Sequence, residues 1–324
     1  MTNNPKLALI QDSPVFLNLV ATLDKTATLA KKAASDGANI IAFPETWLVG
    51  YPVWLDEAKG SALWDDKGAK ALYRLLVKNS LTLGDATCSF LQNLANETGA
   101  ELVMGANEVK GRSLYNTMLF FSPNAEAPII HRKLTPTYTE KLIWAVGDGS
   151  TLEAVETEWG VLSGLICWEH WMPFARAYKH QQNEVVHIAQ WPDVNERHMI
   201  GSRHYAIEGR CFVGASGMVI SKQDVLDGFD SLGVNEPAAR ALLESILEGE
   251  NGLLKNGNSA IIGPDGAFLV DPVLNDKTIV MAELPLDALT EQQLTLDTAG
   301  HYSRPDVFTL EVDTRERSNI VKKN

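Results

Sequence analysis

Short, uninterrupted apolar runs alternate with segments of helical periodicity along most of this chain. Residues 7–10 form the first run and residues 39–43 the second, and apolar side chains recur at three- and four-residue steps between them. Strands buried on both faces have this composition, and strand–helix–strand units cross over with a right hand. The sequence therefore predicts an α/β fold around a largely buried sheet. We expect Ser13 to be the N-cap of the first helix, Pro14 its first residue and Gly37 its end.

The alternation continues to residue 284, without an evident linker, and predicts one large domain. Residues 221–257 have a weaker pattern, which we interpret as a surface excursion with one amphipathic helix at residues 237–247. We expect residues 1–310 to form the domain and residues 311–324 a short C-terminal tail. The other expected elements are helices at 85–98 and 195–208, strands at 102–106, 114–121, 128–133, 185–190, 210–220 and 278–284, and a hairpin turn at Asp265-Gly266.

A reactive side chain follows the apolar run at residues 161–166. Cys167 ends this run, bulky and charged residues come next, and a helical pattern begins at Pro173. A cysteine at such a strand-to-helix turn lies near backbone N–H groups, which lower the pKa of a thiol and favour the nucleophilic thiolate. The alternative is that Cys167 is a small buried hydrophobic residue, which is the usual behaviour of free cysteine.

Two more ionisable residues follow apolar runs. Glu45 comes just after residues 39–43, and Lys133 ends the strand expected at residues 128–133. Ligand sites of α/β folds favour such strand ends, although Glu45 can also be read as a solvated loop residue. A lysine favours a neighbouring thiolate and stabilises a negatively charged intermediate, and a carboxylate acts as general base. Together with Cys167, they predict nucleophilic attack on an electrophilic carbon bonded to nitrogen.

Composition and missing motifs exclude several other classes. The net charge of −13 argues against nucleic-acid binding and a polybasic membrane surface. The three cysteines lie far apart, which argues against a disulfide framework and a zinc ribbon. Neither G-x-S-x-G nor H-E-x-x-H occurs, and no apolar run reaches the roughly 18 residues that span a bilayer. The N-terminus does not resemble a signal peptide, so we expect a cytoplasmic protein.

Five motifs in order resemble those of the carbon–nitrogen hydrolase (nitrilase) superfamily, over roughly residues 6–310. They are Phe43-Pro44-Glu45-Thr46, His131-Arg132-Lys133-Leu134-x-Pro136-Thr137, Cys167-Trp168-Glu169, Glu208-Gly209-Arg210-Cys211-Phe212-Val213 and Gly300-His301-Tyr302-x-Arg304-Pro305-Asp306-Val307-Phe308. The resemblance implies a four-layer αββα sandwich with Glu45 as base, Lys133 as charge stabiliser and Cys167 as nucleophile. It also implies that Glu140 helps to orient the site, and that the protein forms homodimers or higher homo-oligomers, including spirals.

Trp168 and Glu169 after the cysteine resemble the true nitrilases within this superfamily. The resemblance then implies hydrolysis of a small-molecule nitrile to the carboxylic acid and ammonia, through a thioimidate and a thioester and without a metal or organic cofactor. An amidase, a cyanide hydratase or dihydratase with the same triad, and a non-catalytic scaffold on this fold remain alternatives. His170 either tunes the pocket or forms a Cys–His dyad. The candidates for the pocket wall are Trp168, Glu169, His170, Tyr51, Trp54 and Trp191, together with Trp47, Trp144 and Trp171.

Overall fold

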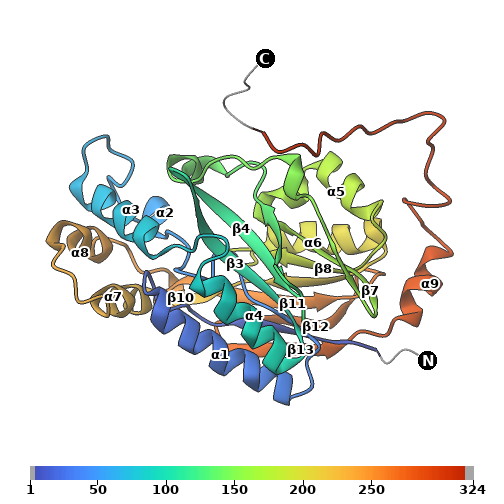
Figure 1. Cartoon of the computed structure of the whole chain (residues 1–324), viewed down its shortest axis with the longest axis horizontal. Coiled ribbons are helices and arrows are strands. Elements are labelled where there is room, and N and C mark those ends of the chain that lie inside the picture. Colours follow the sequence, from blue (N-terminus) through green and yellow to red (C-terminus); the bar gives the residue numbers. More distant parts are fainter. Residues whose placement is uncertain (1–3, 318–324) are drawn as a thin grey trace.

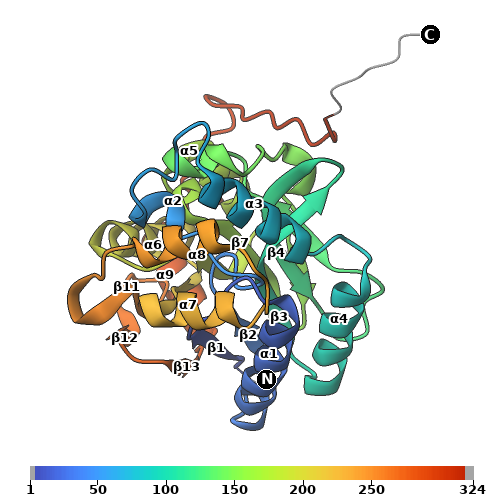
Figure 2. The same ribbon diagram turned by 90° about the vertical axis from the view of Figure 1, so that its left-hand side faces the viewer.

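Two β-sheets pack face to face, and helices cover their outer faces (Figures 1 and 2). These four layers come from a computed structural model, which describes residues 4–317. The predicted αββα sandwich is therefore confirmed. Its inner layer of apolar side chains joins the sheets, with Leu9 and Val103 from the first sheet and Ile188 and Val213 from the second all fully buried.

The first sheet has the strand order β13-β1-β2-β3-β4-β5. Strands β1, β2 and β3 are parallel to one another, β4 and β5 follow as antiparallel neighbours, and β13 pairs antiparallel with β1. The bounds are β1 Lys6–Gln11, β2 Ile40–Ala42, β3 Glu101–Lys110, β4 Ser113–Phe121, β5 Ile129–Arg132 and β13 Thr278–Glu283.

The second sheet has the order β10-β11-β9-β8-β7-β6, and β12 pairs with β11 beside this path. Its centre, β7-β8-β9, is parallel. The bounds are β6 Val155–Thr157, β7 Gly160–Ile166, β8 Glu184–Gln190, β9 Phe212–Ser216, β10 Val219–Ser221, β11 Leu253–Ile262 and β12 Phe268–Leu274. The expected hairpin turn at Asp265-Gly266 joins β11 to β12, where Gly266 has a φ of +80°.

Helices α1, α3 and α4 lie outside the first sheet, and α5 and α6 lie outside the second (Figure 1). The helix bounds are α1 Leu19–Ser35, α2 Trp54–Glu57, α3 Lys67–Asn79, α4 Ala86–Thr98, α5 Pro173–His180, α6 Glu196–Gly209, α7 Lys222–Asp230, α8 Pro237–Glu244 and α9 Asp287–Gln293. Short 3₁₀ turns cover η1 Tyr138–Leu142, η2 Gly149–Thr151, η3 Cys167–Trp171 and η4 Glu250–Gly252.

The predicted start of α1 at Ser13 and Pro14 is wrong. The helix begins five residues after Pro14, at Leu19, because Leu17 has a positive φ of 60° and Asn18 supplies the cap. The Asn18 side chain accepts a hydrogen bond from the backbone N–H of Ala21 at 3.1 Å. A second capping residue close to Ser13 in the sequence thus decides where the helix starts.

The sequence reading also missed helices α3 and α7 and joined two strands into one. Helix α7 buries Val225, Gly228 and Phe229 within nine residues, which is too short a pattern for a clear periodicity. Residues 210–220 divide into β9 and β10 because the chain leaves the first pairing after Ser216.

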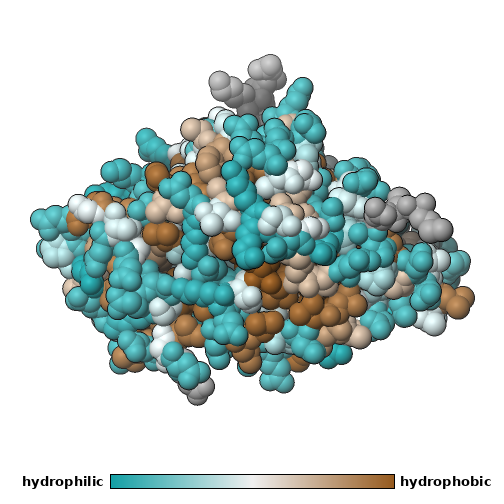
Figure 3. Space-filling model, turned by 90° about the horizontal axis from the view of Figure 1, so that it is seen from below, coloured by the Kyte–Doolittle hydropathy of each residue, from teal (hydrophilic) through white to brown (hydrophobic). Residues whose placement is uncertain are grey.

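The chain after α9 runs across the surface without further helices or strands up to residue 317 (Figure 1). Residues 311–317 of the predicted tail fall in this segment, and residues 318–324 lie outside the described part of the chain. The face turned downward in Figure 1 is largely hydrophilic, with apolar residues gathered near its middle (Figure 3). Within residues 4–317, helices long and apolar enough to cross a membrane are absent.

The position of the α1 cap can be tested by substitution. We expect Asn18→Ala to lower the free energy of unfolding by about 1 kcal/mol, because the first-turn N–H groups lose an acceptor. Thr28→Ala, in the exposed middle of the same helix, is the control and should change it by less than about 0.5 kcal/mol. Urea unfolding measures both, and equal effects would mean that Asn18 does not cap the helix.

Candidate active site

Glu45 lies in a tight loop directly after β2. Thr46 has a positive φ of 51°, and the loop rests on the backbone of β3 at Gly105. A Cβ atom at Gly105 would lie 2.1 Å from the carbonyl oxygen of Pro44, so only glycine allows this close approach. The result is a fully buried Glu45 at the end of a parallel strand.

Lys133 directly follows β5, and two backbone hydrogen bonds, one from its N–H and one to its carbonyl, fix its position. Its N–H donates to the carbonyl of Asn116 at 2.8 Å, and its carbonyl accepts from the N–H of Gly147 at 2.8 Å. A Cβ atom at Gly147 would meet the carbonyl oxygen of Arg132 at 2.4 Å. The ammonium group of Lys133 is therefore delivered into the interior, where the side chain is 1% exposed.

Cys167 stands at the predicted turn, directly after β7 and as the first residue of the 3₁₀ turn η3. Its φ of +57° belongs to the left-handed region, which a side chain with a Cβ atom rarely adopts. Such a conformation turns the thiol out of the strand direction and toward the groups that end β2 and β5. The backbone N–H of Trp168 also contacts the sulfur.

The four predicted catalytic side chains lie together. The Lys133 Nζ atom donates to Glu45 Oε1 at 3.0 Å and to Glu140 Oε2 at 2.7 Å. Asn116 Nδ2 donates to the same Glu45 Oε1 at 2.7 Å. Side-chain atoms of Glu45, Glu140 and Cys167 lie within 4.8 Å of one another. That spacing also suits a metal ion, but the Lys133 ammonium already lies between the two carboxylates.

The second oxygen of Glu45 differs from the first. Oε2 is buried, and no hydrogen-bond partner for it lies among residues 4–317. Because Oε1 already accepts from Lys133 and Asn116, Oε2 is the oxygen that is available to receive a proton. This division of roles between the two oxygens fits a general base beside a thiol.

Glu140 lies in η1 and connects the lysine to the pocket wall. Its Oε2 atom accepts from Lys133 and from the backbone N–H of Thr137 at 2.6 Å. Its Oε1 atom lies 3.2 Å from the hydroxyl of Tyr51, which donates to it. The carboxylate therefore holds both the ammonium and an aromatic side chain of the cavity.

Burial sets the protonation of this cluster. It raises the pKa of Glu45 to about 7, against the opposing charge of Lys133, and Glu140 adds to the rise. The pKa of Cys167 is raised well above its ordinary value, first by burial and then by repulsion from Glu45, although Lys133 lowers it. The expectation of a lowered thiol pKa is therefore corrected. The resting thiol keeps its proton, and a neighbouring base must remove it.

A cavity of about 240 Å³ opens at Cys167. Of the predicted pocket residues, Tyr51 and Trp168 line it. The other lining residues are Asp56, Thr137, Tyr138, Thr139, Glu140, Pro192, Asp193, Asn195, His198 and Lys255. The volume is below the ~300–1,000 Å³ that is usual for ligand pockets, so a small substrate fits.

Several aromatic candidates lie elsewhere. Trp54 and Trp191 are fully buried and do not line this cavity; Trp54 packs edge-on against Phe16, and Trp191 stacks on His170 and His198. The same correction applies to Trp47, which is fully buried, to Trp144, whose ring lies edge-on to Tyr51, and to Trp171, which is 39% exposed. Large aromatic side chains serve the core here because their burial stabilises the fold.

Glu169 is also not a wall residue of this cavity, since its side chain points into the protein. One oxygen accepts from the backbone N–H of Leu134 at 2.7 Å. The other accepts from the N–H of Ile166 at 2.8 Å and contacts His131 Nε2 at 2.8 Å. The carboxylate therefore connects the residue after Lys133 to the residue before Cys167 and fixes the two strand ends relative to each other.

His170 lies beneath the turn instead of in the cavity. Its Nδ1 atom donates to the carbonyl oxygen of Cys167 at 2.7 Å, and its Nε2 atom lies 3.0 Å from His187 Nε2. Burial lowers the pKa of His170 to about 3, so the ring is neutral. The ring contacts the backbone carbonyl of Cys167 and supports the turn.

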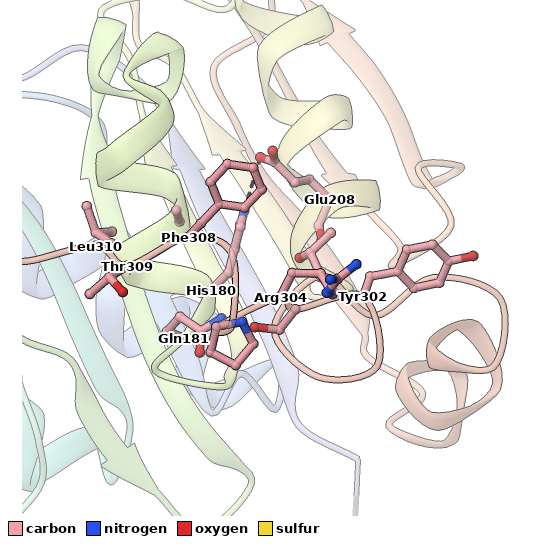
Figure 4. Close-up of a pocket in the computed structure, with 12 residues that line it drawn as sticks. His180, Gln181, Glu208, Tyr302, Arg304, Phe308, Thr309 and Leu310 are labelled. Atoms are coloured by element: carbon pink, nitrogen blue, oxygen red, sulfur yellow. Dashed lines mark hydrogen bonds and ion pairs between the residues drawn. The ribbon is translucent and has the colours of Figure 1, made fainter.

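A larger cavity of about 530 Å³ lies between α5, α6 and the C-terminal segment (Figure 4). Figure 4 shows His180 and Glu208 in contact, with Nε2 of the histidine 3.2 Å from the carboxylate. Tyr302 and Phe308 of the C-terminal segment close the other side. The four clustered groups around Cys167 do not line this space, so size alone does not identify the site.

The sequence reading missed the polar half of the cavity at Cys167. Asp193 is an ionisable residue shortly after β8, as Glu45 is after β2, so the same reasoning from strand ends could have identified it as a site residue. Lys255 lies in β11, within the stretch interpreted as a surface excursion. Asn116 interrupts the apolar pattern of the strand at residues 114–121, and its amide donates to Glu45.

Comparison with known proteins agrees with the fold and the motifs. The carbon–nitrogen hydrolase family model matches residues 6–293. An aliphatic nitrilase of Rhodococcus rhodochrous is 37% identical over 333 residues, covering 98% of this chain and 82% of that protein. A nitrilase of Pseudomonas syringae pv. syringae is 36% identical and covers 94% of this chain and 88% of that protein. The chain belongs to the carbon–nitrogen hydrolase family.

Solved structures share the fold at lower sequence identity. A carbon–nitrogen hydrolase superfamily protein from Xanthomonas campestris, with an arsenic adduct in its active site, has a TM-score of 0.67 at 17% identity. It covers 96% of this chain and 100% of its own. Saccharomyces cerevisiae Nit3, a member of branch 10 of the nitrilase superfamily, has a TM-score of 0.66 at 16% identity, covering 93% of this chain and 97% of its own.

The connection made by Glu169 predicts a pH-dependent contribution to stability. Hydrogen bonds and the contact with His131 hold the pKa of this carboxyl below 4.5 despite burial. The contribution is therefore present above about pH 4.5 and is lost as the pH falls through the folded-state pKa. We expect Glu169→Gln to lower the free energy of unfolding by about 2–4 kcal/mol at pH 7, and by less at pH 4.

Urea unfolding at the two pH values measures this difference. Glu156→Gln, on the exposed surface of β6, is the matched control and should change the free energy of unfolding by less than about 0.5 kcal/mol at either pH. A loss for Glu169→Gln that is equal at both pH values would show that the charge of this carboxylate has no role.

Proposed function

We propose that this protein is a nitrilase, which hydrolyses a small nitrile to its carboxylic acid and ammonia. The observation that carries the proposal is the buried cluster in which Lys133 lies between Glu45 and Glu140, beside the thiol of Cys167. The names of the two similar proteins, an aliphatic nitrilase and a nitrilase, support the choice of substrate.

The first half of the reaction forms a thioimidate. The Cys167 sulfur adds to the nitrile carbon, while its proton moves to Glu45 Oε2 and then to the nitrile nitrogen. Lys133 stabilises the negative charge that develops, since its ammonium is held in place by two carboxylates before the substrate arrives. The backbone N–H of Trp168 stabilises the sulfur during attack.

The second half consumes two waters. Glu45 takes one proton from the first water, whose hydroxide adds to the thioimidate carbon, and passes that proton to the nitrogen, which gives a tetrahedral intermediate with a hydroxyl and an amino group. Glu45 then moves the hydroxyl proton to the amino group, so that ammonia leaves and the thioester carbonyl remains. A second water, activated in the same way, releases the carboxylic acid and restores the thiol. The nitrile and two waters thus give the acid and one ammonia. Glu140 keeps Lys133 in position throughout, since it accepts from the ammonium at 2.7 Å.

A substrate panel tests the proposal. Ammonia release is measured with aliphatic, aryl and arylaceto-nitriles, with the corresponding amides and with cyanide. We expect nitriles to react at least tenfold faster than their amides. Faster hydrolysis of amides would make the protein an amidase, and formamide or formate from cyanide would make it a cyanide hydratase or dihydratase. A protein that is folded and inactive on the whole panel would be a scaffold.

We also infer that the protein assembles as a homodimer or a higher homo-oligomer. Phe174 at the start of α5 is 75% exposed, and Phe308 on the neighbouring C-terminal segment is 78% exposed. Large apolar side chains in such positions favour burial against another surface. Light scattering coupled to size-exclusion chromatography measures the mass, and a monomer at micromolar concentration would contradict this assembly.

The role of Glu45 predicts a defined pH profile. Because its pKa is about 7, the carboxylate becomes protonated below that value, and kcat/KM should fall tenfold per pH unit on the acid side. Glu45→Gln should lose at least 99% of turnover, since an amide does not accept the proton. The same variant should be more stable than wild type at pH 8, by about 1–3 kcal/mol, because ionised Glu45 is buried at a cost.

The sign follows from the raised pKa. The contribution of Glu45 to the free energy of unfolding is present below pH 4.5 and is lost as the pH rises through about 7. Chemical unfolding at pH 5 and pH 8 measures the difference between wild type and Glu45→Gln. A kcat/KM that stays flat between pH 5 and pH 8 would remove Glu45 from the role of base.

The role of Cys167 predicts selective alkylation. All three cysteines are buried, but only Cys167 combines an open cavity with a base, whereas Cys211 is fully buried and Cys88 lines a different groove. Iodoacetamide should label Cys167 at least tenfold faster than the other two, with a parallel loss of activity. Peptide mapping follows each site. Glu45→Gln should slow the labelling, and unchanged labelling in that variant would mean that another group removes the proton.

The position of His170 predicts a structural role. A pKa of about 3 means that the ring does not titrate at working pH. We expect His170→Asn to lower the free energy of unfolding by about 2–4 kcal/mol, through lost stacking and a cavity. Turnover of the folded variant should stay within tenfold, about 1.4 kcal/mol in barrier. His204→Asn, at an exposed histidine, is the control. A loss as deep as that of Cys167→Ala would instead support a Cys–His dyad.

A further inference from the structure

The cavity at Cys167 has a polar outer wall that the proposed chemistry does not use. Its members come from the loop after β8, from the start of α6 and from β11: Asp193, Asn195, His198 and Lys255. A small cavity intended for simple alkyl nitriles would be lined mainly by apolar side chains. The polar wall therefore indicates that the substrate carries a second polar group.

Lys255 is the one cation of this wall that is both sheltered and weakly paired. Its side chain is 13% exposed, and its Nζ atom lies 3.5 Å from Glu57 Oε1, at the limit of a hydrogen bond. This is the sole polar contact of Nζ within residues 4–317. An ammonium group has three donor hydrogens, so at least two of them lack a polar acceptor within the described part of the chain.

Tyr51 sets the spacing between Lys255 and the reacting groups. The hydroxyl of Tyr51 contacts Glu140 at 3.2 Å, and Nζ of Lys255 lies 5.8 Å from the centre of the tyrosine ring. The Lys255 ammonium therefore lies near the ring of Tyr51, whereas the Glu140 carboxylate lies at its hydroxyl. A substrate whose nitrile carbon lies at Cys167 would reach Lys255 with a group that is several carbon atoms away.

The charges around the cavity determine which kind of second polar group the substrate can carry. Glu45 and Glu140 already outnumber Lys133. Lys255 is likewise outnumbered by Asp193 of the outer wall, Asp56 at the rim and Glu57, with which it pairs. A substrate carboxylate would be repelled by this excess of negative charge, and a substrate ammonium would be repelled by Lys255 itself. A neutral hydrogen-bond acceptor meets neither penalty.

Asp56 does not compete for the available donors. One of its oxygens accepts from Thr139 Oγ1 at 2.5 Å, and the other lies 3.1 Å from the Tyr51 hydroxyl, whose single proton it shares with Glu140. Both contacts hold Asp56 at the rim of the cavity, beside η1. The Lys255 ammonium thus keeps its free hydrogens for a group that enters with the substrate.

We propose that Lys255 is a specificity-determining residue, which donates a hydrogen bond to a neutral acceptor at the far end of a short aliphatic nitrile. The acceptor is a second nitrile or an amide. This assignment rests on the proposed nitrilase function and names the substrate class of the same site. It predicts that dinitriles and cyano-amides are preferred over alkyl nitriles, cyano-acids and amino-nitriles of equal length.

The test compares kcat/KM for five compounds of matched length: glutaronitrile, its half-amide, its half-acid, valeronitrile and the amine-terminated nitrile. We expect glutaronitrile and the half-amide to exceed valeronitrile by about tenfold, as for one hydrogen bond to a charged donor. The half-acid and the amine should fall below the half-amide. A half-acid or an amine that is the best substrate would overturn the proposal.

Lys255→Met removes the donors and keeps an unbranched side chain. We expect it to lower the ratio of kcat/KM between glutaronitrile and valeronitrile by about tenfold, whereas Lys255→Arg should keep most of the ratio. Lys31→Met, at a surface lysine of α1, removes the same charge and should leave the ratio unchanged. An unchanged ratio in Lys255→Met would remove Lys255 from substrate recognition.

Binding without turnover separates this inference from the proposed function. Calorimetry on Cys167→Ala should show glutaronitrile binding about tenfold more tightly than valeronitrile, and the difference should disappear when Lys255→Met is added. Equal binding of the two nitriles to Cys167→Ala would contradict the role of Lys255. If the wild-type protein hydrolyses valeronitrile but lacks this preference, the nitrilase function stands and the substrate class fails. Failure to hydrolyse any nitrile would contradict both.

Discussion

The buried ammonium group of Lys133 determines how the rest of the site is built. Its two carboxylate partners come from different parts of the chain, with Glu45 after β2 and Glu140 in η1. A lysine that is 1% exposed would be strongly destabilising without such partners. Burial raises the pKa of Glu45 to about 7, with Glu140 adding to the rise and Lys133 opposing it, and burial together with the negative charge of Glu45 keeps the Cys167 thiol protonated.

Both sheets of the sandwich contribute residues to this charge cluster. In the first sheet, Glu45 follows β2 and Lys133 follows β5, while in the second sheet Cys167 follows β7. Apolar side chains between the sheets hold them together, and Glu169 ties the chain after Lys133 to the chain before Cys167. The distance between thiol and ammonium is therefore set by the packing of one sheet on the other.

The sequence was a good guide where chemistry depends on strand ends. Glu45, Lys133 and Cys167 each follow an apolar run, and the structure brings all three together with Glu140, which the resemblance alone had suggested. It was a poor guide to the pocket wall. Trp54 and Trp191 are as aromatic as Trp168, but they are fully buried in packing, because residue type does not reveal which face of a loop a side chain occupies.

The sequence by itself determined the α/β class, most strands and the reactive groups, since apolar periodicity and strand-end residues are local properties of the chain. Only the tertiary structure decided the protonation of these groups and the composition of the cavity. A pKa depends on burial and on charges that lie far apart in the sequence, such as Lys133 and Glu45, which are 88 positions apart. Lys255 joins the cavity for the same reason: β11 lies beside β9 and β10 in space, which no local pattern around residue 255 records.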